Sequence, residues 1–380
     1  MLFTKKTNEI FLFVFTFILI TIFLPYRQAD MKFRYGLCSL QIFNAILLRF
    51  SRRLRNSPLT LVLFFSLIFL LFTGCCQKKS HRILKLAHVL DTSHPVHKAM
   101  AFMAEQVEEK SNGRLTIKIY PSGQLGQERE LIELLQIGSL AMAKVSTAPL
   151  ESFVPEIKIL GIPYVFRDDT HRWNVLKSDI GRSLLLSGEE CFLRGLCFYD
   201  AGSRSFYTKK IPIHSPKDLK GLKIRVMKSV TSVNMVKALG GSPTPISWGE
   251  LYTALQQGVV DGAENNPPSF FLSHHYEVCQ FYTLDEHTSV PDILLISTAV
   301  WDHLTPQERT WLQQAADESV DFQRKLWDKA CQEALQEVKK AGVTIIYPDK
   351  AAFIRSAEKL HDSYRGTQIF ELINKIKEME

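Results

Sequence analysis

Apolar side chains recur along residues 84–380 at two spacings, one typical of strands and one of helices. Leu115–Tyr120 and Lys223–Val226 alternate polar and apolar residues, which predicts strands, and residues 84–89 form a further short apolar strand. Apolar residues three and four apart predict helices after Pro95 and over residues 128–135. The order strand, helix, strand, helix is typical of an α/β protein with a parallel sheet. The same pattern predicts helices over 168–186, 231–239 and 248–260, strands over 194–200 and 206–208, and a turn over 260–268.

The longest predicted helix covers residues 306–341. The sequence Thr305-Pro306-Gln307-Glu308 has the form of a capping box with proline at the first helical position, and Gly342 follows the last helical residue. At about 1.5 Å per residue, this helix would be roughly 50 Å long. Because that length exceeds the width of one domain, we expect the helix to run along two domains.

The length of 380 residues allows two domains, and 46% hydrophobic with 22% charged residues is ordinary for a globular protein. Residues 1–74 contain nine of the 46 basic residues and two of the 39 acidic residues, so this leader carries the whole net charge of +7. The rest of the chain has equal numbers of acidic and basic residues. A basic surface for nucleic acid is therefore not expected on the folded part.

Two apolar runs precede the folded part, at residues 10–24 and 59–72, and both are shorter than the about 20 residues of a membrane span. The second run follows three arginines within residues 52–55 and ends at Gly74-Cys75, the arrangement of a signal peptide. Gly74-Cys75 resembles a bacterial lipobox, which makes Cys75 the lipidated first residue of a membrane-anchored chain, although Phe72 stands where leucine is usual. Residues 1–50 are either an untranslated upstream extension, an extra anchor or a small membrane domain.

Sequence motifs for catalysis or for a bound metal are missing. The chain contains no GxGxxG, P-loop, HExxH or GxSxG motif, and no zinc-type cysteine or histidine spacing. His88, His94 and His97 lie close together in the sequence, but no further residue that could complete a metal site with them is evident. We therefore expect no enzyme, no cofactor and no metal. Cys191 and Cys197 would either pair in an oxidising compartment or remain free thiols.

Polar residues follow several of the predicted strands. His88, Arg204 and Asn265 lie at strand ends or turns, and Arg225 lies on the strand 223–226 with Ile224 and Val226 facing the other way. Ligands of open α/β sheets bind beyond the carboxyl ends of the strands. Two arginines with amide and imidazole groups suit an anionic, hydroxylated ligand. Trp248 would either form a wall of this pocket or pack in the core.

Several stretches together resemble one family across nearly all of the mature chain. The chain resembles the solute-binding subunit of TRAP (tripartite ATP-independent periplasmic) transporters, the DctP-like family. The resemblance implies a periplasmic, monomeric protein of two α/β lobes with a long helix spanning both, which binds an organic acid and delivers it to membrane permease subunits. The implied division is a leader over 1–75, lobe I over 83–201 plus 291–331, and lobe II over 202–290 plus 332–380. The matching stretches are residues 84–99, 120–133, 218–226 and 240–266 and the helix after Thr305.

The resemblance also implies roles for single residues. Arg225 corresponds to the main carboxylate-binding arginine and Arg204 to a second one, and Ala141 departs from the aspartate common in the family. The run 264–270 and Trp248 favour a uronate or another sugar acid as the ligand. A C4-dicarboxylate or 2-oxo acid remains the alternative, as does a sensory rather than a transport role. The other implied site residues are Asn265, Glu128, Trp248, His88 and Ser146.

Overall fold

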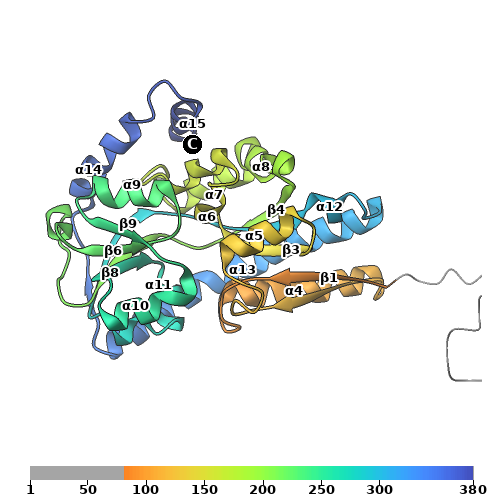
Figure 1. Ribbon diagram of the computed structural model, residues 1–380, viewed down its shortest axis with the longest axis horizontal. Coiled ribbons are helices and arrows are strands. Elements are labelled where there is room, and N and C mark those ends of the chain that lie inside the picture. Colours follow the sequence, from red (N-terminus) through yellow and green to blue (C-terminus); the bar gives the residue numbers. More distant parts are fainter. Residues whose placement is uncertain (1–80, 380) are drawn as a thin grey trace, which may run out of the picture. The chain divides into compact units, whose positions relative to one another are not determined.

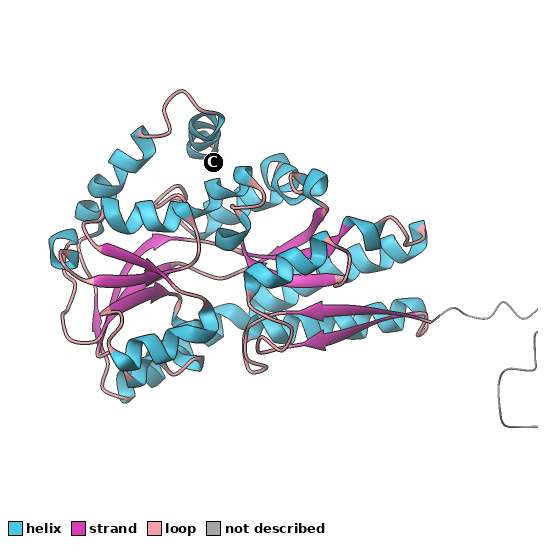
Figure 2. Cartoon of the chain, viewed as in Figure 1, coloured by secondary structure: helices cyan, strands magenta, loops and turns pink. Residues whose placement is uncertain are grey.

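Two mixed β-sheets, each covered by helices, organise residues 81–379, the part of the chain that the computed structural model describes (Figure 1, Figure 2). The leader, with the predicted signal segment and the predicted lipidation site Cys75, lies outside the described residues. The sheet of lobe I has the order β2 (Leu115–Tyr120), β1 (Arg82–Ala87), β3 (Met142–Ser146), β10 (Asp292–Ser297), β4 (Leu193–Tyr199). The sheet of lobe II has the order β11 (Thr344–Ile346), β9 (Phe281–Thr288), β5 (Arg204–Thr208), β8 (Gly262–Asn265), β6 (Lys223–Val226), β7 (Ser242–Pro245).

Each sheet contains parallel strands and one strand that runs against its neighbours. Strands β1, β2 and β3 are parallel, and so are β6, β7 and β8. However, β10 is antiparallel to β3 and β4, and β5 is antiparallel to β8 and β9. Each of these strands comes directly after the chain crosses from the other lobe, so it enters its sheet from the edge at which the parallel strands end. The parallel pairing predicted from the order strand, helix, strand, helix is confirmed for β1 and β2, and each sheet as a whole is mixed.

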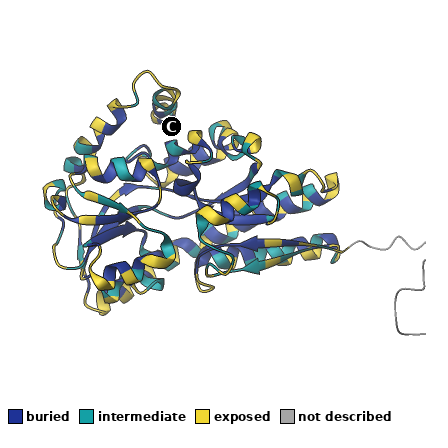
Figure 3. Ribbon diagram, viewed as in Figure 1, coloured by how far each residue is buried: buried dark blue, intermediate teal, exposed yellow. Residues whose placement is uncertain are grey.

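Helices of lobe I pack on its sheet around one large apolar core. Helix α4 follows β1 and contacts β2, helix α5 contacts β3, and helix α8 contacts β4. Buried residues fill both this sheet and the inner helix faces, as Figure 3 shows. The helical segments of this lobe are α4 (Pro95–Ser111), α5 (Glu128–Gln136), α6 (Thr147–Leu150), η3 (Pro155–Gly161), α7 (Asp169–Lys177), α8 (Asp179–Leu186), η4 (Glu189–Cys191) and α12 (Thr298–Trp301).

Lobe II has two smaller apolar clusters, one on each face of its sheet. The last helix, α15 (Gln368–Glu378), instead places Ile373 and Ile376 in the core of lobe I, although the sequence analysis grouped residues 332–380 with lobe II. The helical segments of lobe II are η5 (Pro216–Leu219), α9 (Val230–Ala238), η6 (Trp248–Glu250), α10 (Leu251–Gln257), α11 (Pro267–Leu272), η7 (His275–Glu277) and α14 (Lys350–Asp362).

Helix α13 (Pro306–Lys340) runs through both lobes as one 35-residue helix. Its first half buries Leu312 and Ala316 in the core of lobe I, and Val338 near its end belongs to a cluster of lobe II. The Thr305 side chain accepts from the Glu308 N–H, and Glu308 in turn accepts from the Thr305 N–H at 2.8 Å. The predicted capping box, the length of the helix and its course along two lobes are thus confirmed.

The first segment that crosses between the lobes is fastened to α13. The Gln323 side chain forms two hydrogen bonds of 2.9 Å with the backbone N–H and C=O of Asp200. Two residues further on, Gly202 has a φ of +57°, and a Cβ atom there would lie 3.0 Å from Trp327 Nε1. A side chain at this position would therefore meet both a strained backbone and the indole. The crossing thus has a fixed path beside the helix.

Three predicted elements differ from those observed. Residues 168–186 form two helices, because Ser178 ends α7 and its side chain caps α8 through the Ile180 N–H at 3.1 Å. Residues 248–260 form only a short 3₁₀ turn and the seven-residue α10. The stretch that was read as a turn contains β8, whose four residues are all buried between β5 and β6.

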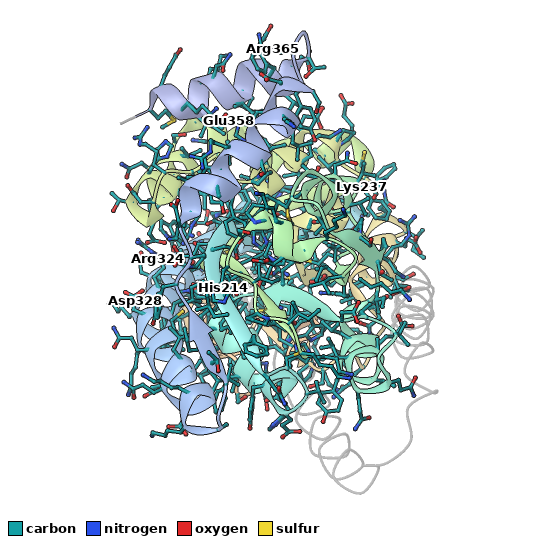
Figure 4. The ribbon with its side chains drawn as sticks, turned by 90° about the vertical axis from the view of Figure 1, so that its left-hand side faces the viewer. His214, Lys237, Arg324, Asp328, Glu358 and Arg365 are labelled. Carbon is teal, nitrogen blue, oxygen red and sulfur yellow. The ribbon has the colours of Figure 1, made fainter. Side chains whose placement is uncertain are left out.

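Charges of both signs cover the outside of the described residues, in keeping with the balanced charge of the folded part. Figure 4 shows Lys237 on α9, Asp328 on α13 and Glu358 on α14 directed outward. Among the described residues, no helix is both long enough and apolar enough to cross a membrane.

Replacing Thr305 tests the capping box. We expect Thr305→Ala to lower the free energy of unfolding by about 1 kcal/mol, because the Glu308 N–H loses its side-chain acceptor and Glu308 loses the hydroxyl that donates to it. Urea titration followed by circular dichroism measures the change. The control is Thr310→Ala, an exposed position on the first turns of the same helix. Equal effects of the two substitutions would contradict the capping role.

Candidate functional site

A cavity between the two lobes collects the polar side chains that end or begin the central strands. The space between the lining side chains is about 480 Å³, including the open solvent at its mouth. Lobe I contributes Val89, Leu90, His94, Glu128, Lys144, Ser146, Val290 and Asp292 to the lining, and lobe II contributes Arg204, Arg225, Met227, Trp248, Asn265, Asn266 and Ser269, with Ala201 between them.

Strand direction brings these side chains to one place. Ser146 and Asn265 are the last residues of the parallel strands β3 and β8, and Arg225 is the third residue of the four-residue β6. Asp292 and Arg204 are the first residues of the antiparallel strands β10 and β5. Ends of parallel strands and starts of antiparallel strands meet at the same edge of a sheet. Both kinds of position therefore face the cavity.

Arg225 is a buried guanidinium that forms no ion pair with a carboxylate of residues 81–379. Its side chain is only 2% exposed, and Nε donates to the Ile246 carbonyl at 2.8 Å. Nη1 is fully buried and has no hydrogen-bond partner among the described residues. Burial lowers the pKa of Arg225, because desolvation disfavours the charged form. The predicted strand 223–226 is thus buried on both faces beyond its first residue, and its arginine is buried rather than solvated.

Arg204 differs from Arg225 because the protein itself neutralises its charge. The guanidinium forms a buried ion pair with Glu264, donates from Nη2 to the Glu264 carbonyl at 2.7 Å and donates from Nη1 to Asn265 Oδ1 at 2.8 Å. Burial would lower the pKa of Arg204, but the Glu264 carboxylate raises it. With four of its five N–H groups engaged, Arg204 has one donor left for a ligand.

A buried histidine supports this ion pair from behind. The ring of His287 lies 2.8 Å from Asp285 Oδ2 and 3.7 Å from Glu264 Oε2, and it stacks on Phe206. Burial would lower the pKa of His287, but Asp285 and Glu264 raise it to about 9. Burial would likewise raise the pKa of Glu264, and Arg204 with His287 lowers it to about 2. Charges of alternating sign therefore hold Arg204 in place.

Asn265 completes the lobe II wall. Its Oδ1 atom accepts from Arg204 and from the Asn266 N–H at 2.9 Å, and its backbone carbonyl accepts from Tyr282. Because Oδ1 is the acceptor in both contacts, the side-chain NH₂ group remains available as a donor. The lobe II wall therefore presents donors from Arg225, Arg204 and Asn265 to the cavity.

Lobe I contributes a lysine between two carboxylates. Lys144 on β3 is 1% exposed and donates to Asp292 Oδ2 at 2.8 Å, and its Nζ lies 4.0 Å from Glu128 Oε1. Glu128, at the start of α5, also accepts from the Ser146 N–H at 2.8 Å. Burial raises the pKa of Glu128, although Lys144 counteracts this shift. Unlike Arg225, the buried lysine has its own counter-ions.

Aromatic rings close two further sides. Trp248 lies with its ring centroid 5.9 Å from Arg225 Cζ and also packs edge-on against His275. His94 caps α4 by accepting from the Val96 N–H, and burial lowers its pKa to about 3, so its ring is neutral at pH 7. Trp248 therefore both lines the cavity and packs against His275.

Six of the seven predicted side chains meet in this cavity, but His88 does not. Its ring is fully buried, accepts from the Leu90 N–H and lies 3.0 Å from His97 Nδ1, outside the lining. The histidine that lines the cavity is His94. Sequence reasoning also missed Lys144 and Asp292, although a single charge beside an apolar run was a usable signal in both strands. Asn266 and Ser269 were missed too.

Hydrogen bonds join the lobes around the cavity. Gln127 of lobe I accepts from the Gly249 N–H at 3.1 Å, and Glu151 of lobe I accepts from the Thr231 N–H at 3.0 Å in the first turn of α9. His94 contacts Ser269 across the cavity at 3.4 Å. These contacts bring the two walls of the cavity together.

Within residues 81–379, no group of three or more His, Cys, Asp and Glu side chains is arranged to hold a metal ion. The four cysteines of this part, Cys191, Cys197, Cys279 and Cys331, are free. The cavity therefore has the chemistry of a site for a small polar anion: an unpaired guanidinium, further donors and partly free carboxylates.

Two α/β lobes around a polar, arginine-containing cavity define a periplasmic binding protein. The model of the bacterial extracellular solute-binding protein family 7, DctP, matches residues 86–367. The chain belongs to this family, the solute-binding subunits of TRAP transporters, and the predicted family and fold are confirmed. Members of the family are transport proteins of the periplasm rather than enzymes.

Relatives of known structure or name agree with this assignment. A TRAP solute-binding protein of Xanthobacter autotrophicus with bound β-D-galacturonate is 38% identical, with a TM-score of 0.76 over 78% of this chain and 100% of that one. One of Pseudomonas putida with bound D-glucuronate is 35% identical, with a TM-score of 0.76 over 79% and 98%. The C4-dicarboxylate-binding periplasmic protein DctP of Rhodobacter capsulatus is 31% identical over 74% of this chain and 85% of its own length.

The buried histidines predict a maximum of stability near neutral pH. The pKa of His287 in the folded protein, about 9, exceeds the ordinary 6.5, so its stabilising contribution is complete below pH 6.5 and is lost as pH rises through 9. The pKa of His94 and of His275 is lowered to about 3, so their contribution is lost as pH falls below 6.5. Thermal unfolding measured from pH 4 to 10 should show both limbs.

The variant His287→Gln should flatten the alkaline limb, which we expect to be worth on the order of 3 kcal/mol in the native protein. The exposed His214 (Figure 4) provides the matched control, His214→Gln, which should leave the limb intact. An alkaline limb of unchanged size in His287→Gln would show that His287 does not carry this charge.

Proposed function

We propose that the cavity binds a sugar acid of the uronate class and that Arg225 binds its carboxylate. The observation that carries this proposal is the buried Nη1 atom of Arg225, which has no hydrogen-bond partner among the described residues. A buried donor without a partner costs about 1–3 kcal/mol, and more when it is charged. A ligand carboxylate would satisfy this donor and would supply the counter-ion that the protein does not provide.

The other walls of the cavity suit the hydroxyl groups of the same ligand. Arg204 and Asn265 have donors left, and Glu128 is a buried acceptor on the opposite lobe. Trp248 offers a flat face near Arg225, and we assign to it the role of covering the sugar ring. Ser146, at the end of β3, lies within reach of the same ligand. The family resemblance implied each of these residues as part of the site, with Arg204 as a second carboxylate-binding arginine.

The ligands of the solved relatives support the same class. The two relatives with a bound uronate are 38% and 35% identical to this chain, and the similarity covers 100% and 98% of their own length. One contains β-D-galacturonate and the other D-glucuronate. The relative named for C4-dicarboxylates has a lower identity of 31%. We therefore propose that this chain binds a uronate and passes it, as a monomer, to the permease subunits of its transporter.

Substitution of Arg225 tests its role as the residue that binds the ligand carboxylate, hereafter the clamp. On residues 76–380, D-glucuronate and D-galacturonate at 100 times their Kd should raise the free energy of unfolding by about 2.7 kcal/mol, visible as a rise in Tm. Arg225→Ala should weaken binding by at least about 100-fold, because a charge-assisted pair is lost inside a buried site. Differential scanning fluorimetry and isothermal titration calorimetry measure both quantities.

The matched control is Lys223→Ala, which removes an exposed charge from the same strand. It should bind uronate like the wild type. If Arg225→Ala kept the wild-type affinity for a uronate, the clamp would be assigned to the wrong residue. If the folded wild type bound neither uronate, the proposed ligand class would fail.

We also propose that Cys75 anchors the exported protein. The apolar run 59–72 and the pair Gly74-Cys75 support cleavage before this cysteine and its lipidation. Cys75→Ser should move the protein from the membrane fraction to the soluble fraction of a bacterial host. Cys76→Ser serves as the control and should stay with the membrane. Retention of Cys75→Ser in the membrane would contradict a lipid anchor at this residue.

A further inference from the structure

Three buried cations line the cavity, and they differ in their partners. Arg225 has no carboxylate within ion-pair distance among the described residues, whereas Arg204 is paired with Glu264. Lys144 is paired with Asp292 and lies near Glu128. Only one of the three therefore has its full charge available to a ligand. The site has room for one carboxylate charge and provides no free cation for a second.

A rigid group on lobe I consists of a lysine and the two carboxylates between which it lies: Lys144, Asp292 and Glu128. It is called the acidic trio hereafter. Asp292 on β10 lies opposite Ser146 on β3, so Lys144, two residues before Ser146, is its diagonal neighbour on the same face of the sheet. The side chains of the trio are 2%, 10% and 13% exposed, respectively. Their position follows from strand register and from the start of α5, not from a mobile loop.

The trio still has hydrogen-bonding capacity that faces the cavity. Asp292 Oδ2 accepts from Lys144, and Glu128 Oε1 accepts from the Ser146 N–H. The second oxygen of each carboxylate forms no hydrogen bond with the described residues, although both side chains line the cavity. An ionised carboxylate only accepts, and the ammonium group of Lys144 has three N–H groups. Acceptors and donors thus lie side by side, which suits hydroxyl groups, since each can donate and accept.

We propose that the acidic trio determines specificity by selecting ligand hydroxyl groups and rejecting a second carboxylate. The inference rests on the proposed function of the cavity. Hydroxyl groups far from the ligand's carboxylate donate to Asp292 and Glu128 and accept from Lys144. A carboxylate in the same place is a buried charge next to two like charges, because Lys144 is already paired. Such a charge is unfavourable unless it is compensated. The site therefore takes polyhydroxy monocarboxylates and excludes C4-dicarboxylates.

Calorimetric titrations with two ligand classes test this selectivity. D-glucuronate and D-galacturonate represent the first class, and succinate and L-malate represent the second. We expect wild-type residues 76–380 to prefer the uronates by at least about 100-fold. The double variant Glu128→Gln/Asp292→Asn keeps the shape of the trio, removes both negative charges and frees Lys144. Its affinity for uronates should fall at least tenfold, and its affinity for dicarboxylates should rise.

Three further variants separate the causes. Lys144→Met should lose uronate affinity without gaining dicarboxylate affinity, because no cation is released. Glu130→Gln removes an exposed charge two residues from Glu128 and should behave like the wild type. Arg225→Ala should lose both ligand classes, since each requires the clamp. Thermal unfolding without ligand shows whether each variant is folded.

The outcomes distinguish this inference from the proposed function. Uronate binding by the wild type, with an unchanged uronate-to-dicarboxylate ratio in the double variant, overturns only the role of the acidic trio. Equal wild-type affinities for both classes overturn that role without any variant. Binding of dicarboxylates alone, lost in Arg225→Ala, overturns both the trio's role and the uronate assignment.

Discussion

One buried guanidinium without a counter-ion determines the character of this site. Strand β6 holds Arg225 between two other strands, where its charge is costly and where, among the described residues, its guanidinium donates to a single carbonyl, that of Ile246. The protein compensates Arg204 and Lys144 with its own carboxylates but leaves this charge to a ligand. Rigidity matters here, because a guanidinium fixed on a central strand loses little freedom when an anion arrives.

The sequence predicted those helices and strands that are determined by residues close together in the chain. The capping box at Thr305 and the strand predicted over Leu115–Tyr120 depend on residues a few positions apart, and both appear in the structure. Strand β8 could not be recognised in the same way, because Glu264 and Asn265 are polar and become buried only through Arg204, about 60 residues earlier in the chain. Likewise, Ser178 ends one helix and starts the next, so a continuous apolar pattern concealed a break.

The site residues also divide into those with a local signal in the sequence and those without one. Arg225 and Asn265 stand near the ends of parallel strands, where the general rule for α/β sheets directs attention. Asp292 stands at the beginning of an antiparallel strand, and its partner Lys144 lies 148 residues away in sequence. The reversal of β10 and β5 is a consequence of the chain crossing twice between the lobes, which the apolar pattern alone did not reveal. His88 was expected in the cavity because it follows the end of β1, but His94, six residues further along the chain, lines the cavity instead. The apolar pattern showed where the strand ends and did not show how the chain continues from there.

The continuity of α13 has a mechanical consequence for any change in the angle between the two lobes. Because the helix belongs to the cores of both lobes, a change in the angle between them bends the helix or slides one of its packed faces. Bending is distributed over many backbone hydrogen bonds, each of which lengthens only slightly. Gln323, which bonds the middle of α13 to the backbone of the crossing at Asp200, ties the helix to the segment that any such change of angle would also move.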